Sequence, residues 1–218
     1  MKFDNAKKGI KTVYNAEILS IVASIIAIVA AVLMLVLGSL AKDGQANASD
    51  VISTISLIVA GIIGIVAYIM NIVGISAASK DNADFKNALY MIIGAIVVSI
   101  ASTLLEKKMP GLSRSLKVSE NIFELLVAYY VINGCTGIAK QVGNAAVEAE
   151  GKKTMKFFLT VWIIGVVVEV IGKVVEIFSK STALTVVAGL LGLAALVLSL
   201  VCYFAYLKLL RKTLDILN

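Results

Sequence analysis

Six apolar segments, most of them long enough to cross a lipid bilayer, constrain the fold of this chain more than any other feature. A transmembrane helix needs about 20 apolar residues to cross a hydrocarbon core of about 30 Å. Segments of this length are expected to be helices, because an open sheet edge cannot face lipid. With 60% of its residues apolar and 16% charged, the 218-residue chain cannot bury all its apolar surface in one water-soluble core. The predicted fold class is therefore all-α, a polytopic transmembrane bundle of six helices over residues 18–41, 51–78, 85–105, 122–139, 155–177 and 184–210.

The basic residues outside these segments predict the orientation of the chain. If the N-terminus is cytoplasmic, thirteen of the 20 lysines and arginines fall on the inner side and seven on the outer side. The positive-inside rule then predicts a multi-pass protein of the plasma membrane with both termini in the cytoplasm. The loop over residues 106–120 is an exception, with four cations on the outer side. Segment 122–139 is the weakest span because it carries polar residues, but omitting it worsens the charge count.

Residues 1–17 form a basic segment with helical periodicity ahead of the first span. Phe3, Ala6, Ile10 and Val13 recur at helical spacing, and lysines flank them. The apolar stretch that follows is too long for the core of a cleaved signal peptide, so we expect an uncleaved anchor. The segment is either a short helix lying on anionic headgroups or a solvated basic tail. Lipid headgroups also explain the net charge of +6 better than a nucleic acid partner does.

The composition argues against several kinds of chemistry. The chain has no histidine, which removes imidazole ligands and histidine general bases, and we expect no metal site and no cofactor. It also lacks a glycine-rich phosphate loop and a Gly-x-Ser-x-Gly elbow, so an enzyme is not expected. Cys135 and Cys202 both lie in apolar segments, where they are expected to pack as small side chains.

Small residues predict where helices approach one another closely. Ala23, Ala27 and Ala31 form the longest stripe and are the predicted seam to another molecule, either a second copy or a partner subunit. Residues 59–67 resemble residues 187–195, which indicates a weak internal repeat or chance within a restricted alphabet. The repeated motif supplies four further packing glycines, Gly61, Gly64, Gly189 and Gly192.

Polar residues at membrane depth are the candidate functional residues, because lipid excludes them unless they have a role or a partner. Glu169, Lys173 and Glu176 share one face of the fifth segment. This face either lines a water-filled cavity or carries side chains that snorkel to the membrane surface. Tyr130 and Asn133 lie on a polar stripe of the fourth segment. Asn71 in the second segment is a possible hydrogen-bond partner for that stripe.

The size of 23.0 kDa, the six predicted helices and the alanine stripe at Ala23, Ala27 and Ala31 resemble the substrate-binding subunits of energy-coupling-factor vitamin transporters. The resemblance implies that these alanines dock a shared energising module. Proline-containing loops are typical of that family, whereas Pro110 is the only proline in this chain.

The leading functional hypothesis is a small transporter or channel for an ion or small solute, acting as an oligomer. The alternatives are a non-transporting membrane subunit that works by helix packing, and an importer subunit of the type just described. Glu169 separates the first two hypotheses, since Glu169→Gln should abolish flux or proton dependence if the chain is a transporter.

Overall fold

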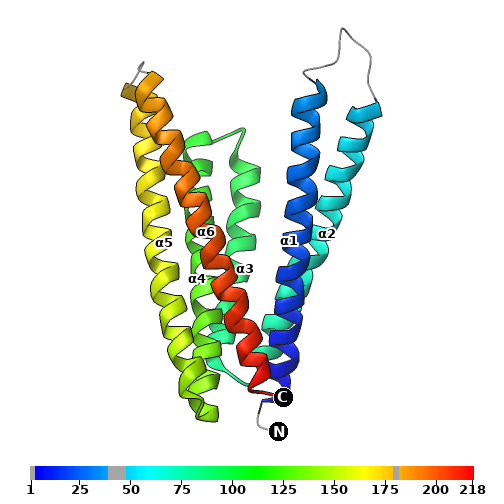
Figure 1. Cartoon of the computed structure of the whole chain (residues 1–218), viewed down its shortest axis with the longest axis vertical. Helices are drawn as coiled ribbons and strands as arrows, with labels where there is room; N and C mark the ends of the chain where they lie inside the picture. The colour runs from blue at the N-terminus through cyan, green and yellow to red at the C-terminus, as the bar shows by residue number, and fades with distance from the viewer. Residues whose placement is uncertain (1–2, 39–47, 179–181) are drawn as a thin grey trace. The chain divides into compact units, whose positions relative to one another are not determined.

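A computed structural model describes residues 3–38, 48–178 and 182–218, and these residues form six helices without a strand. Figure 1 shows them as three antiparallel pairs along the chain. This confirms the predicted all-helical class, and all six helices are long and apolar enough to cross a membrane. The helices are α1 (Asp4–Gly38), α2 (Ala48–Ala78), α3 (Ala83–Leu105), α4 (Pro110–Val142), α5 (Ala145–Phe178) and α6 (Thr182–Asp215).

Most helices extend beyond the predicted apolar segments because hydropathy detects only the part suited to lipid. One such difference is in α4, which begins at Pro110 within the predicted loop over residues 106–120. Proline is favoured in the first turn of a helix, where its missing N–H costs nothing. At the other end, α4 stops at Gly143, whose φ of 78° is left-handed, and Asn144 caps α5 by accepting from the Val147 N–H at 3.0 Å.

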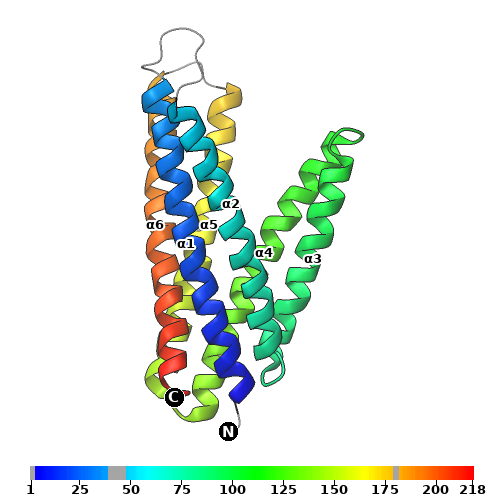
Figure 2. The ribbon, with the colours of Figure 1, turned by 90° about the vertical axis from the view of Figure 1, so that its right-hand side faces the viewer.

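The chain forms two compact units, residues 1–81 and 82–218. In the first unit α1 packs along α2. In the second unit α3 packs on α4, α5 packs on α6, and α4 also contacts both α5 and α6. The α3–α4 pair and its connecting turn are clearest in Figure 2. Each helix has an end that we call basal. It is the N-terminal end of α1, α3 and α5 and the C-terminal end of α2, α4 and α6. The opposite end of each helix is called distal.

The α1–α2 pair is joined along a seam of small residues that repeat every seven positions. The buried members on α1 are Gly9, Ala16, Ala23 and Ala30, and those on α2 are Ser53, Ala60, Ala67 and Gly74. An added Cβ on Gly74 would lie 2.7 Å from the Gly9 carbonyl oxygen, so these two residues face each other directly. In an antiparallel pair with a seven-residue repeat, this contact places each further α1 member opposite one on α2. Ala16 then faces Ala67, Ala23 faces Ala60, and Ala30 faces Ser53.

The predicted alanine stripe is only partly in this seam. Ala23 is buried against α2, whereas Ala27 is half-buried and Ala31 is exposed. Four-residue steps drift around a helix by about 40° each, so a stripe defined by them leaves a seam that repeats every seven residues. Ala23 therefore serves packing within this chain.

The basic N-terminal segment is continuous with the first span. Residues 4–38 form a single helix, and its apolar residues Phe3, Ala6, Ile10 and Val13 are all buried. The basal end is closed by Asp81, whose carboxylate accepts from the Ala6 N–H at 2.7 Å and from Asn5 Nδ2 at 3.0 Å. The next residue, Asn82, caps α3 through the Asp84 N–H. The turn 79–82 thus both fastens α1 and starts α3.

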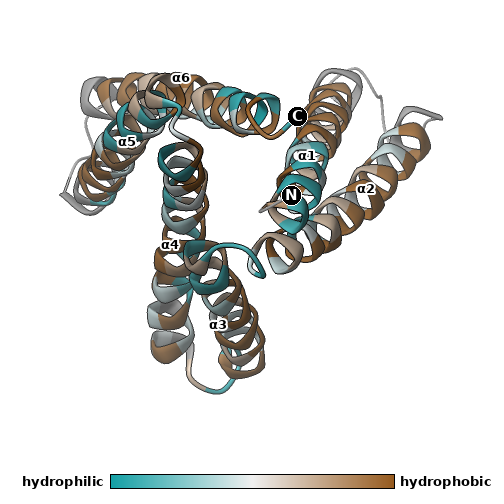
Figure 3. Cartoon of the chain, turned by 90° about the horizontal axis from the view of Figure 1, so that it is seen from below, coloured by the Kyte–Doolittle hydropathy of each residue, from teal (hydrophilic) through white to brown (hydrophobic). Residues whose placement is uncertain are grey.

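Fully buried large side chains concentrate near the basal ends of the helices. In the first unit they are Ile10, Val13 and Ile75; in the second they are Phe85, Val131, Ile132, Ile138, Leu209 and Leu210. Toward the distal ends, large apolar residues such as Ile25, Ile62, Val97, Val167 and Leu193 are exposed. Within each unit, hydrophilic residues gather near the turns and helix ends (Figure 3). The helices therefore have a water-excluding core at one end and lipid-facing sides along the rest.

All seven tyrosines lie between seven and thirteen residues from the basal end of their own helix. This is roughly 10 to 20 Å at the rise of an α-helix. The tyrosines are Tyr14, Tyr68, Tyr90, Tyr129, Tyr130, Tyr203 and Tyr206. On these helices the basic residues of the basal half lie closer to the end than the tyrosines do. Tyrosine prefers the interface between lipid and water, so the tyrosines predict the basal boundary of the membrane at this level.

Candidate functional site

Polar side chains at membrane depth occur in each unit, and the first unit contains a carboxyl–amide pair. Asn71 Nδ2 on α2 donates to Glu17 Oε1 on α1 at 2.9 Å, and both residues are half-buried. The Asn71 Oδ1 atom is buried and accepts no hydrogen bond from the described part of the chain. Asn71 therefore bonds within its own hairpin. The sequence did not indicate Glu17 as a site residue, because it directly precedes the first apolar segment and is typical of the polar residues that flank a span.

The predicted charged face of α5 is on the surface of the chain. Glu169 and Lys173 form an ion pair one turn apart, and their side chains are 60% and 64% exposed. Trp162 and Val166, which continue this face, are also exposed. The side chain of Glu176 lies outside the described residues. Within the chain, this face presents a neutral charge pair at membrane depth on an otherwise apolar surface.

The α4 stripe lies in the most enclosed part of the second unit. Tyr130 and Asn133 are half-buried, and Tyr130 packs edge-on against Tyr129 with ring centroids 5.4 Å apart. Asn133 is nine residues from the basal end of α4, or about 14 Å. Its amide forms no hydrogen bond with any residue that the structure describes, and neither of its polar atoms is fully buried, so the amide is accessible to water or a solute. Residues Val131, Ile132, Gly134 and Cys135 around it are buried.

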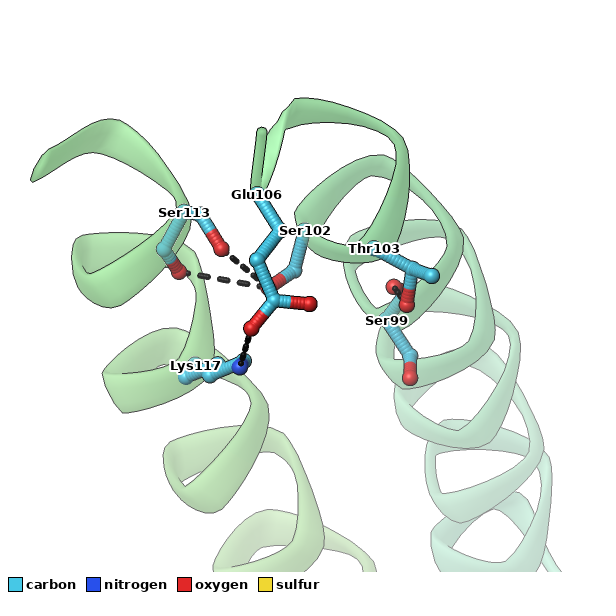
Figure 4. Close-up of polar contacts among 6 residues, drawn as sticks. All are labelled: Ser99, Ser102, Thr103, Glu106, Ser113 and Lys117. Carbon is cyan, nitrogen blue, oxygen red and sulfur yellow. Dashed lines mark hydrogen bonds and ion pairs between the residues drawn. The ribbon is translucent and has the colours of Figure 1, made fainter. Parts of the chain in front are cut away.

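The distal ends of α3 and α4 are joined by polar contacts (Figure 4). The buried Ser102 hydroxyl donates to the Ser113 carbonyl oxygen at 3.2 Å and lies 3.2 Å from the Ser113 hydroxyl. Lys117 Nζ lies 2.9 Å from Glu106 Oε1 in an exposed ion pair. These contacts account for part of the polar sequence at 106–120, since Lys117 is neutralised locally and Ser113 is a packing residue.

The basal ends of α5 and α6 are joined by charge. Glu150 on α5 lies 3.1 Å from Lys208 Nζ and 3.0 Å from Lys212 Nζ on α6. Glu148 instead pairs with Lys152 on its own helix. Cys135 and Cys202 are both buried and free. No group of three or more potential metal ligands occurs in residues 3–38, 48–178 and 182–218.

The glycines of the repeated motif have no close neighbours among the residues that the structure describes. A Cβ added at Gly61, Gly64, Gly189 or Gly192 would meet nothing within 4 Å. The glycines in close contact are different ones. Gly74 meets Gly9, and Gly134 lies against the Phe85 ring. Sequence spacing alone does not distinguish the two groups, because helical glycines look alike until their neighbours are known.

The fold and these contacts define a helical multi-pass membrane protein. Comparisons with protein-family models, with curated protein sequences and with solved structures give no match.

Proposed function

We propose that this protein is a small, non-enzymatic transporter or channel of the plasma membrane that moves an ion or small solute through its helices. In this proposal both termini are cytoplasmic, the basal lysines contact anionic headgroups, and the protein acts as an oligomer. The positive-inside distribution of its cations supports this orientation.

The amide of Asn133 is the observation that carries the proposal. It is half-buried on α4, the helix that contacts α3, α5 and α6, and it has no partner among the described residues. An amide in an apolar environment costs free energy unless water or a solute satisfies it. Tyr130 lies one turn further from the basal end and can supply a hydroxyl to the same species. Together they form a candidate polar binding site for the transported species, beside the basal membrane boundary.

Flux into proteoliposomes tests the proposal. The purified full-length protein would be reconstituted and screened with pH-sensitive and potential-sensitive dyes and with a panel of radiolabelled small solutes. Flux should fall at least tenfold in Asn133→Leu and should persist in Asn121→Leu, an exposed asparagine of the same helix. Wild-type vesicles that stay tight to all the ions and solutes tested would refute a transport function.

A second candidate function, a non-transporting membrane subunit, is supported by Glu169 and Lys173. Charged side chains are rarely placed on the lipid-facing side of a helix, whereas a partner helix can use them for recognition. In this role, cross-linking in native membranes should capture a partner protein along α5, and Glu169→Gln with Lys173→Gln should abolish the cross-link. In the importer-subunit version of this function, Ala31 is the only exposed member of the alanine stripe available for docking.

A further inference from the structure

The Glu17–Asn71 pair in the first unit combines a carboxyl group with an amide that is held at only one of its two polar atoms. Asn71 Nδ2 donates to Glu17 Oε1 at 2.9 Å, while the buried Oδ1 receives no donor from the described residues. An amide that only fixed helix packing would be expected to have both its oxygen and its nitrogen bonded. Here Glu17 alone determines which way the Asn71 amide points.

The two protonation states of a carboxyl group require opposite partners. A carboxylate only accepts hydrogen bonds, whereas a carboxylic acid also donates one. The Asn71 amide can satisfy either state, because its NH₂ group serves the carboxylate and its oxygen serves the acid. Rotation by half a turn about the last side-chain bond exchanges these two atoms. The unheld Oδ1 leaves this rotation free of any competing hydrogen bond from the described residues.

The groups around this pair in the hairpin favour a proton over a metal ion. Residues 51–78 of α2 contain no Asp, Glu, Lys or Arg, and Tyr68 is their only titratable group. On α1, Tyr14 lies one turn closer to the basal end and Lys11 about two turns closer. A hard metal cation takes about six or more oxygen ligands. The pair supplies three oxygens, and one of these already accepts the amide N–H.

We propose that Glu17 and Asn71 form a proton-binding site at the basal membrane boundary. A proton from the basal aqueous phase adds to a Glu17 oxygen, the amide turns, and the new O–H donates to Asn71 Oδ1. Release of the proton to water restores the Nδ2–H to carboxylate bond, so no other reactant is consumed. This site lies in the first unit and does not depend on the role in transport proposed for Asn133.

Infrared difference spectroscopy of the full-length protein in lipid nanodiscs tests the site directly. On acidification, protonation of Glu17 should add a carboxylic C=O band that is absent in Glu17→Gln. The same band should persist in Glu169→Gln, the matched control, because Glu169 pairs with Lys173 on another helix. A full set of acid bands in Glu17→Gln would overturn the proposal, whatever the flux measurements show.

Asn71 variants test whether the amide participates. Asn71→Leu removes both the donor to the carboxylate and the acceptor for the acid. The bond to the charged carboxylate is the stronger of the two, so the midpoint of the Glu17 band should move up by about one pH unit, a tenfold change in proton affinity. Asn121→Leu should leave the midpoint unchanged. If Asn71→Leu does not fold, Asn71→Ser in place of it should shift the midpoint in the same direction, since a serine hydroxyl is too short to reach Glu17. An unchanged midpoint in the folded variant would show that Asn71 plays no part.

Discussion

Glycine at position 74 is required by the closeness of two helix backbones. An added Cβ there would lie 2.7 Å from the Gly9 carbonyl oxygen and 2.8 Å from the Val13 nitrogen. Both are main-chain atoms, so relief requires the helices to separate. At Gly64, one seam repeat and a turn away on the same helix, the added atom would meet nothing.

Gly74→Ala should therefore lower the stability of the α1–α2 pair by about 1 to 3 kcal/mol, the usual cost of overpacking. Gly64→Ala should be neutral or stabilising, because alanine favours the helix by roughly 0.5 to 1 kcal/mol. The measurement is the midpoint of thermal unfolding in detergent, followed by circular dichroism. Equal midpoints for the two variants would contradict the register in which Gly9 faces Gly74.

The sequence predicted which face of a helix a polar residue occupies better than it predicted which residues that polar residue contacts. Glu169 was correctly placed on one face with Lys173, because helical spacing alone brings residues four apart together. The Glu17–Asn71 bond could not be predicted, since the two residues are 54 positions apart in sequence and their contact depends on the register of α1 against α2. The partnerless Asn133 amide is likewise visible only when the neighbours of α4 are known.

At the scale of the helix, apolar length was sufficient to predict six helices but not their ends. Lipid-facing residues fix the middle of each helix, whereas capping residues and proline fix its termini. Residues 110–121 illustrate this: they are too polar for a span, yet Pro110 starts a helix there. The repeat of seven in α1 and α2 was also present in the sequence, whereas the spacing of four residues predicted Ala27 and Ala31 instead.

Glu150 joins two helices by charge, since it reaches both Lys208 and Lys212 across the α5–α6 pair. Glu150→Gln should increase amide hydrogen exchange over the basal turns of α6, and high salt should reproduce part of the effect. Glu148→Gln is the control, because its ion pair lies within α5. Similar exchange in the two variants would show that the inter-helix bridge contributes nothing.

The first unit should form a hairpin without the rest of the chain. Its seam, the Asp81 contacts with Asn5 and Ala6, and the Glu17–Asn71 bond all lie within residues 1–81. We expect a fragment of residues 1–81 to be helical and monomeric in detergent. The basal ends of both its helices should resist proteolysis. The same fragment with Gly74→Leu is the control and should lose that protection. An unprotected wild-type fragment would show that the hairpin needs the second unit.

At the scale of the whole molecule, six spans place both chain ends on one side and the α3–α4 turn on the other. Asn218 and Met109 are exposed residues at these two positions. In a background of Cys135→Ala and Cys202→Ala, Met109→Cys should react with a membrane-impermeant maleimide in intact cells. Asn218→Cys should react only after permeabilisation. The reverse pattern would overturn the proposed orientation, and labelling of both in intact cells would overturn the three spans, α4, α5 and α6, that separate Met109 from Asn218.

The separation of a basal core from lipid-facing sides means that a chemical denaturant acts on only part of the fold. Urea weakens burial where apolar groups leave contact with one another for water, which applies to the basal core and not to side chains already facing lipid. In vesicles, we expect urea to open the base while most of the helix content remains. Cys135, fully buried in that core, should then become reactive to a thiol reagent well before circular dichroism changes. The protein therefore has one stability toward water and another toward lipid, and the thiol of Cys135 measures the first.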